Sequence, residues 1–525
     1  MVATSQPLAV AAGLDLLRAG GNAADAAVAT AAALNVTEPT STGIGGDVFV
    51  LYYQAATGQV SALNGSGRAP QALTLERLRR DLDGEFPPYH AHTVTVPGAC
   101  AAWSDLLDRF GRLGLAAALA PAIRLADTGF PVALITAAGW KRGAENQLSK
   151  APNGHELTIT GRAPRAGEIF RNPGLARTLQ AVAAGGKVAF YEGSIAEAIV
   201  AVLRQAGGVM DAVDLAGHRS TWEQPISTTY RGLRVWECPP NGQGLAALLA
   251  LNLVEGFDLA SLPSLGAERL HLEIEAMRLA FADARWFIAD PAMVPVPTAD
   301  LLSKEYASRR RQLIDPSRAA VDPRRGVPGR DSGTVYLSVV DGEGNACSLI
   351  NSNYMGFGTG IVPKGWGFSL QNRGHNFELD PAHPNVLAPG KRPYNTIIPA
   401  LITRPDPAGF EQLYASYGVM GGFMQPQGHL QVAIGLIDDG LDPQAALDRP
   451  RFCIEGGESG GAVALEEGIP LDSLAGLADL GHRIRIRGGS RRSIFGRGQV
   501  ILYDRDTGVM AGGSDPRADG CAMAL

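Results

Sequence analysis

The first part of the chain alternates between helical and strand-like patterns of apolar residues. Over residues 7–19 the apolar positions recur at helical spacing, and Gly20-Gly21 is a helix stop. Asn22 is placed to cap a second helix over residues 23–34. That helix consists almost entirely of Ala and Val, which suits close packing in a buried layer.

Strand patterns follow a glycine-rich turn. Residues 48–53 and 60–63 are predicted to be two strands joined by a turn. Residues 100–320 are predicted to be mainly helical, with a helix over 270–288 that ends at Asp290-Pro291.

A second hairpin is predicted at residue 334. Residues 316–333 are rich in Pro, Gly and Arg, which predicts a polar and poorly structured connection. Residues 334–340 and 346–350 then form strands around the turn at 341–345. Because both strands are largely apolar, we expect a sheet that is covered on both faces.

Composition narrows the function classes. The chain has 525 residues, of which 46% are hydrophobic, so a large core and two to four domain-sized units are expected. The net charge of -6 gives no reason to expect nucleic acid or an anionic membrane as a partner. No apolar run of about 20 residues is present, so no membrane span is expected.

Cysteine and histidine usage predicts neither disulfides nor a metal. The five cysteines form no CxxC pair, and we expect reduced thiols. The nine histidines form no HExxH motif, so no structural or catalytic metal is expected. The start lacks a signal-peptide pattern, which favours a cytoplasmic location, although an upstream segment trimmed from this sequence is left open.

The Gly333-Thr334 junction has two interpretations. It is an ordinary boundary between loop and strand, or it is a site of self-cleavage. In the second case the Thr334 hydroxyl attacks the Gly333 carbonyl, and hydrolysis frees the α-amine of Thr334. That amine has a pKa near 7.7–8.0, so it can act as the general base for its own hydroxyl.

A series of motifs decides between these interpretations. In order along the chain they are Gly20-Gly21-Asn22-Ala23-Ala24-Asp25, Gly45-Gly46-Asp47, Ala69-Pro70, Val96-Pro97-Gly98, Glu275-Ala276-Met277-Arg278, Phe357-Gly358-Thr359-Gly360, Lys391-Arg392-Pro393, Gly421-Gly422 and Ser514-Asp515-Pro516-Arg517. Over nearly its whole length the chain therefore resembles the γ-glutamyltransferase (γ-glutamyl transpeptidase) family, with Thr334 at the position of the family's nucleophile.

The resemblance implies a fold and a processing scheme. It implies a four-layer αββα sandwich of the N-terminal-nucleophile hydrolase type, of class α+β. It implies a zymogen that cleaves itself into a large subunit, 1–333, and a small subunit, 334–525, which stay together. It implies no organic cofactor, and an acyl-enzyme ester on Thr334 that passes to water or to an amine.

The resemblance also assigns residues around the nucleophile. Ser352 matches a hydroxyl that hydrogen-bonds the nucleophile, although a Ser that caps backbone at a strand end is an equal alternative. Gly421 and Gly422 match the oxyanion hole, where backbone N–H groups meet the developing negative charge. A plain tight turn is the alternative for these glycines.

The substrate site departs from the family pattern. The family's carboxylate-binding Arg falls at Ser66, and Arg68 is a candidate substitute or a solvated Arg. The Asp that pairs with an α-ammonium falls at Asn376, and the paired serines fall at Asn395 and Thr396. A family Gln falls at Arg373, which adds a cation that either binds a carboxylate or pairs with Glu378 or Asp380.

These differences leave several functions open. Family membership alone suggests a γ-glutamyl donor and glutathione metabolism. The substitutions instead favour an amide of an acid without an α-amine, such as oxamate or an acylated β-lactam, because Asn376 supplies no charge for an ammonium group. A catalytically silent homologue that binds a small acid is the third hypothesis. The sequence does not settle whether processed heterodimers form a homo-oligomer.

Overall fold

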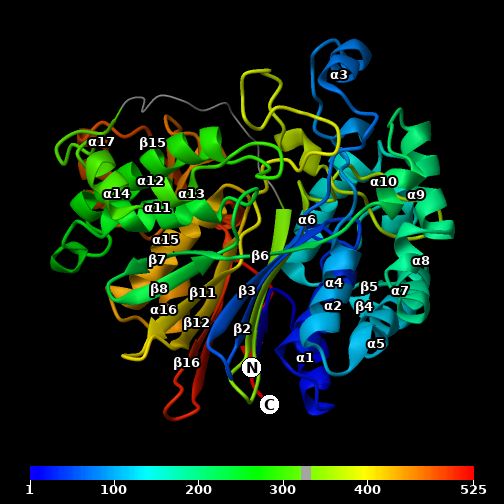
Figure 1. The fold of residues 1–525 in the computed structure, drawn as a ribbon, viewed down its shortest axis with the longest axis horizontal. Helices are drawn as coiled ribbons and strands as arrows, with labels where there is room; N and C mark the ends of the chain where they lie inside the picture. The colour runs from blue at the N-terminus through cyan, green and yellow to red at the C-terminus, as the bar shows by residue number, and fades with distance from the viewer. Residues whose placement is uncertain (321–332) are drawn as a thin grey trace.

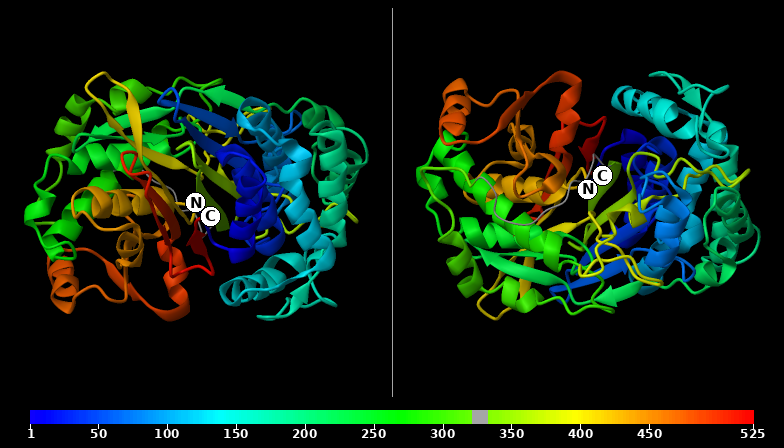
Figure 2. Two further views of the ribbon diagram at one scale, coloured as in Figure 1. Left: turned by 90° about the horizontal axis from the view of Figure 1, so that it is seen from below. Right: turned by 90° about the horizontal axis from the view of Figure 1, so that it is seen from above.

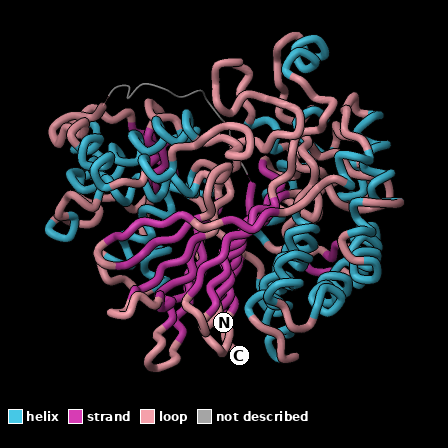
Figure 3. Tube along the Cα trace, viewed as in Figure 1, coloured by secondary structure: helices cyan, strands magenta, loops and turns pink. Residues whose placement is uncertain are grey.

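Two stacked β-sheets lie at the centre of the protein, with helices on both outer faces (Figures 1 and 3). The computed structural model describes residues 1–320 and 333–525. This arrangement is the four-layer αββα sandwich that the resemblance implied. None of the helices in these two ranges combines the length and apolar character needed to span a bilayer.

The strands of the first sheet come from both sides of residue 333. In spatial order they are β18 (Cys521–Met523), β1 (Val2–Thr4), β9 (Gly333–Val340), β10 (Ala346–Tyr354), β2 (Asp47–Gln54), β3 (Gln59–Gly65) and β6 (Thr221–Glu223). The pairs β1–β9 and β10–β2 join segments far apart in the sequence, and Ile350 faces Tyr336 on β9 and Phe49 on β2. Strand pairing therefore holds the two parts of the chain together.

The second sheet also contains strands from both sides of residue 333. Its order is β17 (Met510–Ser514), β16 (Arg497–Tyr503), β12 (Glu411–Met420), β11 (Ala400–Pro405), β8 (Leu233–Glu237) and β7 (Ile226–Tyr230). Two smaller sheets contain β13 (Phe452–Ile454), β14 (Val463–Glu466) and β15 (Ile484–Arg487), and β4 (Phe130–Pro131) and β5 (Ile169–Phe170). The two termini meet where β18 pairs with β1 (Figure 2).

The helices divide between the two outer layers. Over the first sheet and beyond it lie α1 (Pro7–Arg18), α2 (Ala23–Thr37), α3 (Leu75–Leu82), α4 (Ala99–Phe110), α5 (Gly114–Thr128), α6 (Leu134–Gly143), α7 (Pro173–Gly185), α8 (Val188–Tyr191), α9 (Ser194–Gln205) and α10 (Ala212–Ala216). On the side of the second sheet lie α11 (Gly244–Val254), α12 (Ala267–Phe287), α13 (Thr298–Leu301), α14 (Lys304–Arg311), α15 (Met424–Ile437), α16 (Pro443–Asp448) and α17 (Leu471–Asp479).

The first two helices form as their sequence predicts. The side chain of Asn22 accepts hydrogen bonds from the backbone N–H groups of Ala24 and Asp25, and the Asp25 carboxylate accepts one from the Asn22 N–H. This capping box satisfies N–H groups that the first turn of a helix leaves without partners. Every residue of α2 is buried, as expected for a helix of Ala and Val between other layers.

The middle of the chain is less helical than expected. Strands β7 and β8 form a hairpin through Arg231 and Gly232, which have φ of 50° and 81°. Two successive residues with positive φ are typical of a tight hairpin turn. Because β7 lies at the edge of its sheet and is half-exposed, its hydrophobic signal is weak. The predicted connection at 316–333 lies mostly outside the described residues.

Candidate active site

Thr334 lies near the start of β9, inside the first sheet. Strand β9 pairs with β1 on one side and with β10 on the other. The side chain of Thr334 is fully buried, and its Oγ1 lies 3.1 Å from the Oγ of Ser352 on β10. The structure therefore brings the predicted nucleophile against the hydroxyl that the resemblance assigned to it.

The end of β10 is bent where it carries Ser352. The pairing with β9 shifts register between Asn351 and Tyr354, and Tyr354 has a φ of 76°. The Oγ of Ser352 accepts a hydrogen bond from the Tyr354 N–H at 2.9 Å. This local bond is the backbone-capping alternative foreseen for Ser352, and it coexists with the contact to Thr334.

Arg373 contacts the same serine. It begins a short 3₁₀ turn, Arg373–Asn376, and its side chain has no exposed surface. Its Nη2 donates to Ser352 Oγ at 3.0 Å and its Nη1 donates to Thr396 Oγ1 at 2.7 Å. The guanidinium also lies 4.6 Å from the centre of the Tyr354 ring. Burial lowers the pKa of Arg373 to about 10, although a neighbouring carboxylate opposes this shift.

That carboxylate belongs to Asp47, the first residue of β2. One Asp47 oxygen lies 3.6 Å from Arg373 Nε, so the ion pair is made with Asp47 in place of the expected Glu378 or Asp380. The carboxylate also accepts bonds from the Gly67 N–H at 2.9 Å, from Gln371 at 2.9 Å and from Asn395 at 3.2 Å. Burial raises the pKa of Asp47 to about 6, and these partners limit the rise.

Gly421 and Gly422 form the turn between β12 and α15. Their φ angles are 132° and 59°, values that side chains other than glycine rarely adopt. Neither backbone N–H of the pair donates a hydrogen bond to another residue in the described ranges. The Gly422 carbonyl accepts a bond from Gln243, and Gln243 also bonds the carbonyl of Thr396. The glycine turn is therefore tied to the residues around Arg373, with two N–H donors left over.

The other predicted substrate residues separate into two groups. Asn395 joins the site through Asp47, while the side-chain amide of Asn376 donates to the Tyr394 carbonyl at 3.0 Å. Arg68 instead donates to the carbonyl of Arg219 at 3.4 Å, and its charge adds to the effect of burial in lowering the pKa of Arg392. The structure thus places Arg68 in a different set of contacts from that of Arg373, and a substrate role for Arg68 stays a prediction.

A cavity of about 900 Å³ adjoins the glycine turn. Gly421 and Met355 line it, together with apolar side chains such as Phe423 and three arginines, Arg142, Arg487 and Arg491. Glu455 also lines it, but Arg485 and Arg487 pair with that carboxylate at 2.6 and 2.8 Å. The cavity is large enough for a small organic substrate and carries excess positive charge.

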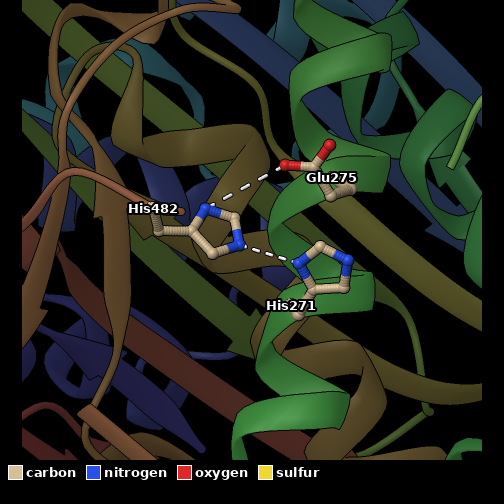
Figure 4. A group of neighbouring side chains, drawn as sticks. All are labelled: His271, Glu275 and His482. Atoms are coloured by element: carbon tan, nitrogen blue, oxygen red, sulfur yellow. Dashed lines mark hydrogen bonds and ion pairs between the residues drawn. The ribbon is translucent and has the colours of Figure 1, made fainter. Parts of the chain in front are cut away.

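A separate cluster has side chains of the types that bind metals. His271 and Glu275 of α12 face His482, which follows α17 (Figure 4). His482 lies between the other two: its Nε2 is 2.8 Å from His271 Nδ1, and its Nδ1 is 4.0 Å from Glu275. Each ring nitrogen of His482 faces a different neighbour, and of these two contacts only the one with His271 is within hydrogen-bond distance.

The role of Asp47 in this site was not predicted from the sequence, in which the residue stood out only as part of a glycine-rich motif. A carboxylate that begins a strand of buried residues needs a cationic or hydrogen-bonding partner, and that requirement was the available signal.

The five cysteines are free thiols, and four of them are buried.

Comparisons with known proteins find relatives over nearly the whole chain. The family model described as gamma-glutamyltranspeptidase matches residues 9–525. The chain is 35% identical to the glutathione hydrolase-like YwrD proenzyme of Bacillus subtilis (strain 168), covering 100% of this chain and 98% of that protein. It is 32% identical to the oxamate amidohydrolase proenzyme of Klebsiella pneumoniae, with 99% and 98% covered.

A solved structure extends the similarity to three dimensions. The crystal structure of cephalosporin acylase from Bacillus halodurans superimposes with a TM-score of 0.92 at 48% identity, and covers 100% of this chain and 95% of that one. These relatives support an amidohydrolase or acyltransferase, and the proenzyme names of two of them suggest a processed precursor. The chain belongs to the gamma-glutamyltranspeptidase family.

Proposed function

We propose that this protein is an amidohydrolase that cleaves itself between Gly333 and Thr334 and then uses Thr334 as its nucleophile. The observation that carries the proposal is the buried Thr334 hydroxyl, 3.1 Å from Ser352, at the second residue of a strand that begins with Gly333. A buried hydroxyl needs a hydrogen-bond partner in any case, and here the partner is a second hydroxyl beside the junction at which a nucleophile would be freed.

Self-cleavage uses the same hydroxyl. The Thr334 Oγ1 attacks the carbonyl carbon of Gly333, the C–N bond breaks, and the acyl group moves from nitrogen to oxygen as an ester. Water then hydrolyses the ester, which leaves a carboxylate on Gly333 and a free α-amine on Thr334. With a pKa near 7.7–8.0, a useful fraction of this amine is neutral at physiological pH.

Turnover repeats this chemistry on a substrate amide. The α-amine takes the Oγ1 proton as Oγ1 attacks the carbonyl, and the N–H groups of Gly421 and Gly422 stabilise the oxyanion. The resulting ammonium protonates the departing amine. Water, deprotonated by the same amine, then hydrolyses the acyl-enzyme ester, so one amide and one water yield an acid and an amine. An amine that replaces water would receive the acyl group instead.

The interleaved sheets explain how two fragments would remain one enzyme. Cleavage would divide the chain into 1–333 and 334–525. In the first sheet, β1 and β2 of the large fragment flank β9 and β10 of the small one, and in the second sheet β8 pairs with β11. Separation would break these ladders and expose buried apolar faces, so the two subunits are expected to stay associated.

The acyl group proposed is that of an acid without an α-amine. Asn376 is uncharged, and its amide is already turned toward the Tyr394 carbonyl. Within the described residues, Nη1 and Nη2 of Arg373 each donate one N–H, to Thr396 and to Ser352, and the second N–H of each suits a carboxylate. The names of the oxamate amidohydrolase and the cephalosporin acylase among the relatives support this class.

Intact mass of the purified protein, beside Thr334→Ala, tests the proposal. Two fragments that divide at Gly333–Thr334, absent from the variant, are expected. Amides of one dicarboxylic acid, with and without an α-amine, then test the acyl class by their kcat/KM values. An uncut wild-type chain would leave the silent homologue as the better interpretation, and equal or better use of the α-amino amide would restore the γ-glutamyl donor.

A further inference from the structure

Thr334 lies beyond the end of strand pairing at one edge of β9. Strand β1 pairs with β9 from Val339 to Leu337, and Thr4, opposite Leu337, is the last residue of β1. Thr334 lies nearer the start of β9 than Leu337 does. Because buried backbone groups need hydrogen-bond partners, the carbonyls at this edge must be satisfied by something other than β1.

Two side chains take over where β1 ends. On an antiparallel strand, alternate residues direct their C=O groups to the same neighbour, so the carbonyls of Tyr336 and Thr334 face the same side. The Thr4 hydroxyl donates to the Tyr336 carbonyl at 2.9 Å. Arg497 donates from Nη2 to the Thr334 carbonyl at 3.4 Å. Arg497 thus bonds the backbone of the proposed nucleophile itself.

A buried carboxylate fixes the guanidinium of Arg497. Its Nη1 donates to Glu38 Oε1 at 2.9 Å, and Glu38 is only 1% exposed. The other oxygen of Glu38 accepts from Ser5 at 2.6 Å and from Gln6 at 3.3 Å. Ser5 and Gln6 directly follow β1. The segment after β1 is therefore linked to Thr334 through Glu38 and Arg497, where strand pairing has stopped.

Arg497 also belongs to the framework of the glycine turn. It begins β16, and its partner across the ladder is Met420, the residue before Gly421. The preceding residue, Gly496, lies so close to the turn that a Cβ on Gly421 would be 3.2 Å from the Gly496 Cα. The nucleophile and the oxyanion turn extend from different sheets, and Arg497 contacts both: its backbone pairs beside the turn, and its side chain bonds Thr334.

We infer that Arg497, held by Glu38, is a positioning residue that sets Thr334 in place relative to the oxyanion turn. The inference rests on the proposed function of Thr334 and adds two residues that act through its backbone. A misplacement of about 1 Å lowers a rate by about a hundredfold, so a bond that fixes the Thr334 carbonyl affects catalysis without touching the substrate.

Cleavage makes this contact more important. In the precursor, Thr334 is bonded covalently to Gly333 on one side and to Val335 on the other. After cleavage, Thr334 is the first residue of the small subunit, and a chain end is poorly held unless something ties it down. Because Arg497 provides such a tie, turnover should depend on Arg497 more strongly than self-cleavage does.

The test variant removes both charges. Arg497→Met alone would leave the Glu38 carboxylate buried without its partner, which is strongly destabilising. Arg497→Met combined with Glu38→Gln avoids this at similar side-chain size. We expect cleavage of the full-length precursor, followed by intact mass, to slow by about tenfold, and kcat of the processed protein to fall by about a hundredfold.

The turnover measurement uses glutaryl p-nitroanilide, a chromogenic amide of a dicarboxylic acid without an α-amine. The KM for this probe should not change, because Arg497 and Glu38 act on Thr334 and not on the substrate. The cleavage measurement needs no substrate, so it tests the inference whichever acyl group the enzyme prefers.

A second variant keeps the buried charge paired. Arg497→Lys retains a cation for Glu38, but one ammonium cannot reach both the carboxylate and the Thr334 carbonyl as the planar fork does. This variant should therefore unfold at about the wild-type temperature and still lose kcat. Thermal unfolding of every variant shows whether the fold is retained.

Thr4→Val is the matched control. It keeps the shape of the side chain and removes the bond to the Tyr336 carbonyl, at the same edge of β9. If these side chains only stabilise the edge of the sheet, Thr4→Val and the double variant should lose the same activity. If Arg497 positions the nucleophile, Thr4→Val should cleave itself and turn over at close to the wild-type rates.

The outcomes separate the inference from the function on which it rests. Wild-type cleavage and kcat in the folded double variant or in Arg497→Lys overturn the inference and leave Thr334 as the nucleophile. A raised KM with an unchanged kcat also overturns it, because the two residues would then act on the substrate. Equal losses in Thr4→Val do the same, because the effect would then belong to the sheet edge. An uncut wild-type chain removes the proposed function and the inference together.

Discussion

The carboxylate of Asp47 and the guanidinium of Arg373 lie 3.6 Å apart, and neither side chain has any exposed surface. Burial raises the pKa of Asp47 to about 6, against the attraction of Arg373. Burial shifts the pKa values of Arg392 and Tyr191, and the charge of Asp47 makes a smaller contribution to both. Asp47 therefore changes its charge within the range in which the protein would be assayed.

We predict that self-cleavage slows as the pH falls through about 6. Protonation removes the Asp47 charge that holds Arg373. The cleavage rate should therefore fall about tenfold for each pH unit below about 6, as expected for the uptake of one proton. The measurement is the cleavage rate of the precursor between pH 5 and 8. Cleavage is a better measure than turnover, because the α-amine of Thr334 is still part of a peptide bond and does not titrate.

Loss of stability through Asp47 would not produce this effect. Its folded pKa lies above the unfolded value of about 3.9, so folding favours the protonated form. The contribution of Asp47 to stability is thus present below about pH 4 and is lost as the pH rises through about 6. In Asp47→Asn the fall in the cleavage rate at acid pH should disappear. If the fall persists, another group is responsible for it.

We predict that Gly421→Ala abolishes most turnover. An added Cβ would lie 3.2 Å from Gly496 Cα and 3.3 Å from Met424 Cβ, at a φ of 132°. The turn must shift to relieve these contacts, which moves the two N–H donors from the oxyanion. Loss of one such donor typically lowers kcat by about 10²-fold to 10³-fold.

Gly440→Ala is the matched control for that variant. Gly440 has a φ of 60°, and a Cβ there meets nothing within 4 Å. Both variants should lose about 1–2 kcal/mol of stability through backbone strain, but only Gly421→Ala should lose kcat. Equal kcat in the two variants would mean that Gly421 forms a plain turn.

Local patterns predicted the parts of the fold that depend on neighbours in sequence. The capping of α2 by Asn22 and the hairpin that begins with Thr334 both follow from residues a few positions apart. The predicted end of the second strand at Ile350 was short, because β10 continues to Tyr354 and carries Ser352 with it. The bulge that aims Ser352 has no signature in the pattern of apolar residues.

The pairing of Asp47 with Arg373 shows what local patterns could not predict. These residues are 326 positions apart by their numbers, and they meet only because β2 and the segment after β10 fold onto one edge of the site. The added cation at Arg373 was predicted, and its expected partners lay nearby in the sequence, at Glu378 or Asp380. A buried Asp at the start of an apolar strand was the distant partner.

We predict that Asn376→Asp increases the use of donors with an α-amine. The new carboxylate would supply the anion that an ammonium group needs when it is desolvated. The ratio of kcat/KM for an α-amino amide to that for its des-amino counterpart should rise by about tenfold, the value of one charged hydrogen bond. Asn376→Ala is the control, since it also removes the bond to Tyr394 without adding charge. If the ratio is the same in Asn376→Asp and Asn376→Ala, the acyl group does not bind next to residue 376.

The last prediction concerns the cluster of His271, Glu275 and His482. His271 Nε2 lies 2.8 Å from the Asp315 carbonyl and donates to it, and its Nδ1 lies 2.8 Å from His482 Nε2. His482 Nδ1 lies 4.0 Å from Glu275 Oε1, and neither of these two atoms has a hydrogen-bond partner in the described ranges. Glu275 in turn accepts from the Ala320 N–H. The cluster thus anchors the last described residues before the Gly333 junction.

Acid should therefore destabilise the protein through this cluster. Burial lowers the pKa of His482 to about 3, whereas the unfolded value is about 6.5. The unfolded chain then binds a proton that the folded chain refuses, so stability is lost as the pH falls below about 6.5, by about 2 kcal/mol at pH 5. The check is urea unfolding of Thr334→Ala, in which no cleavage interferes, at pH 7 and pH 5. His482→Gln should be less stable than Thr334→Ala alone at pH 7, but its free energy of unfolding should fall less between pH 7 and pH 5. If that fall is the same with and without His482, then His482 is protonated in the folded protein at pH 5.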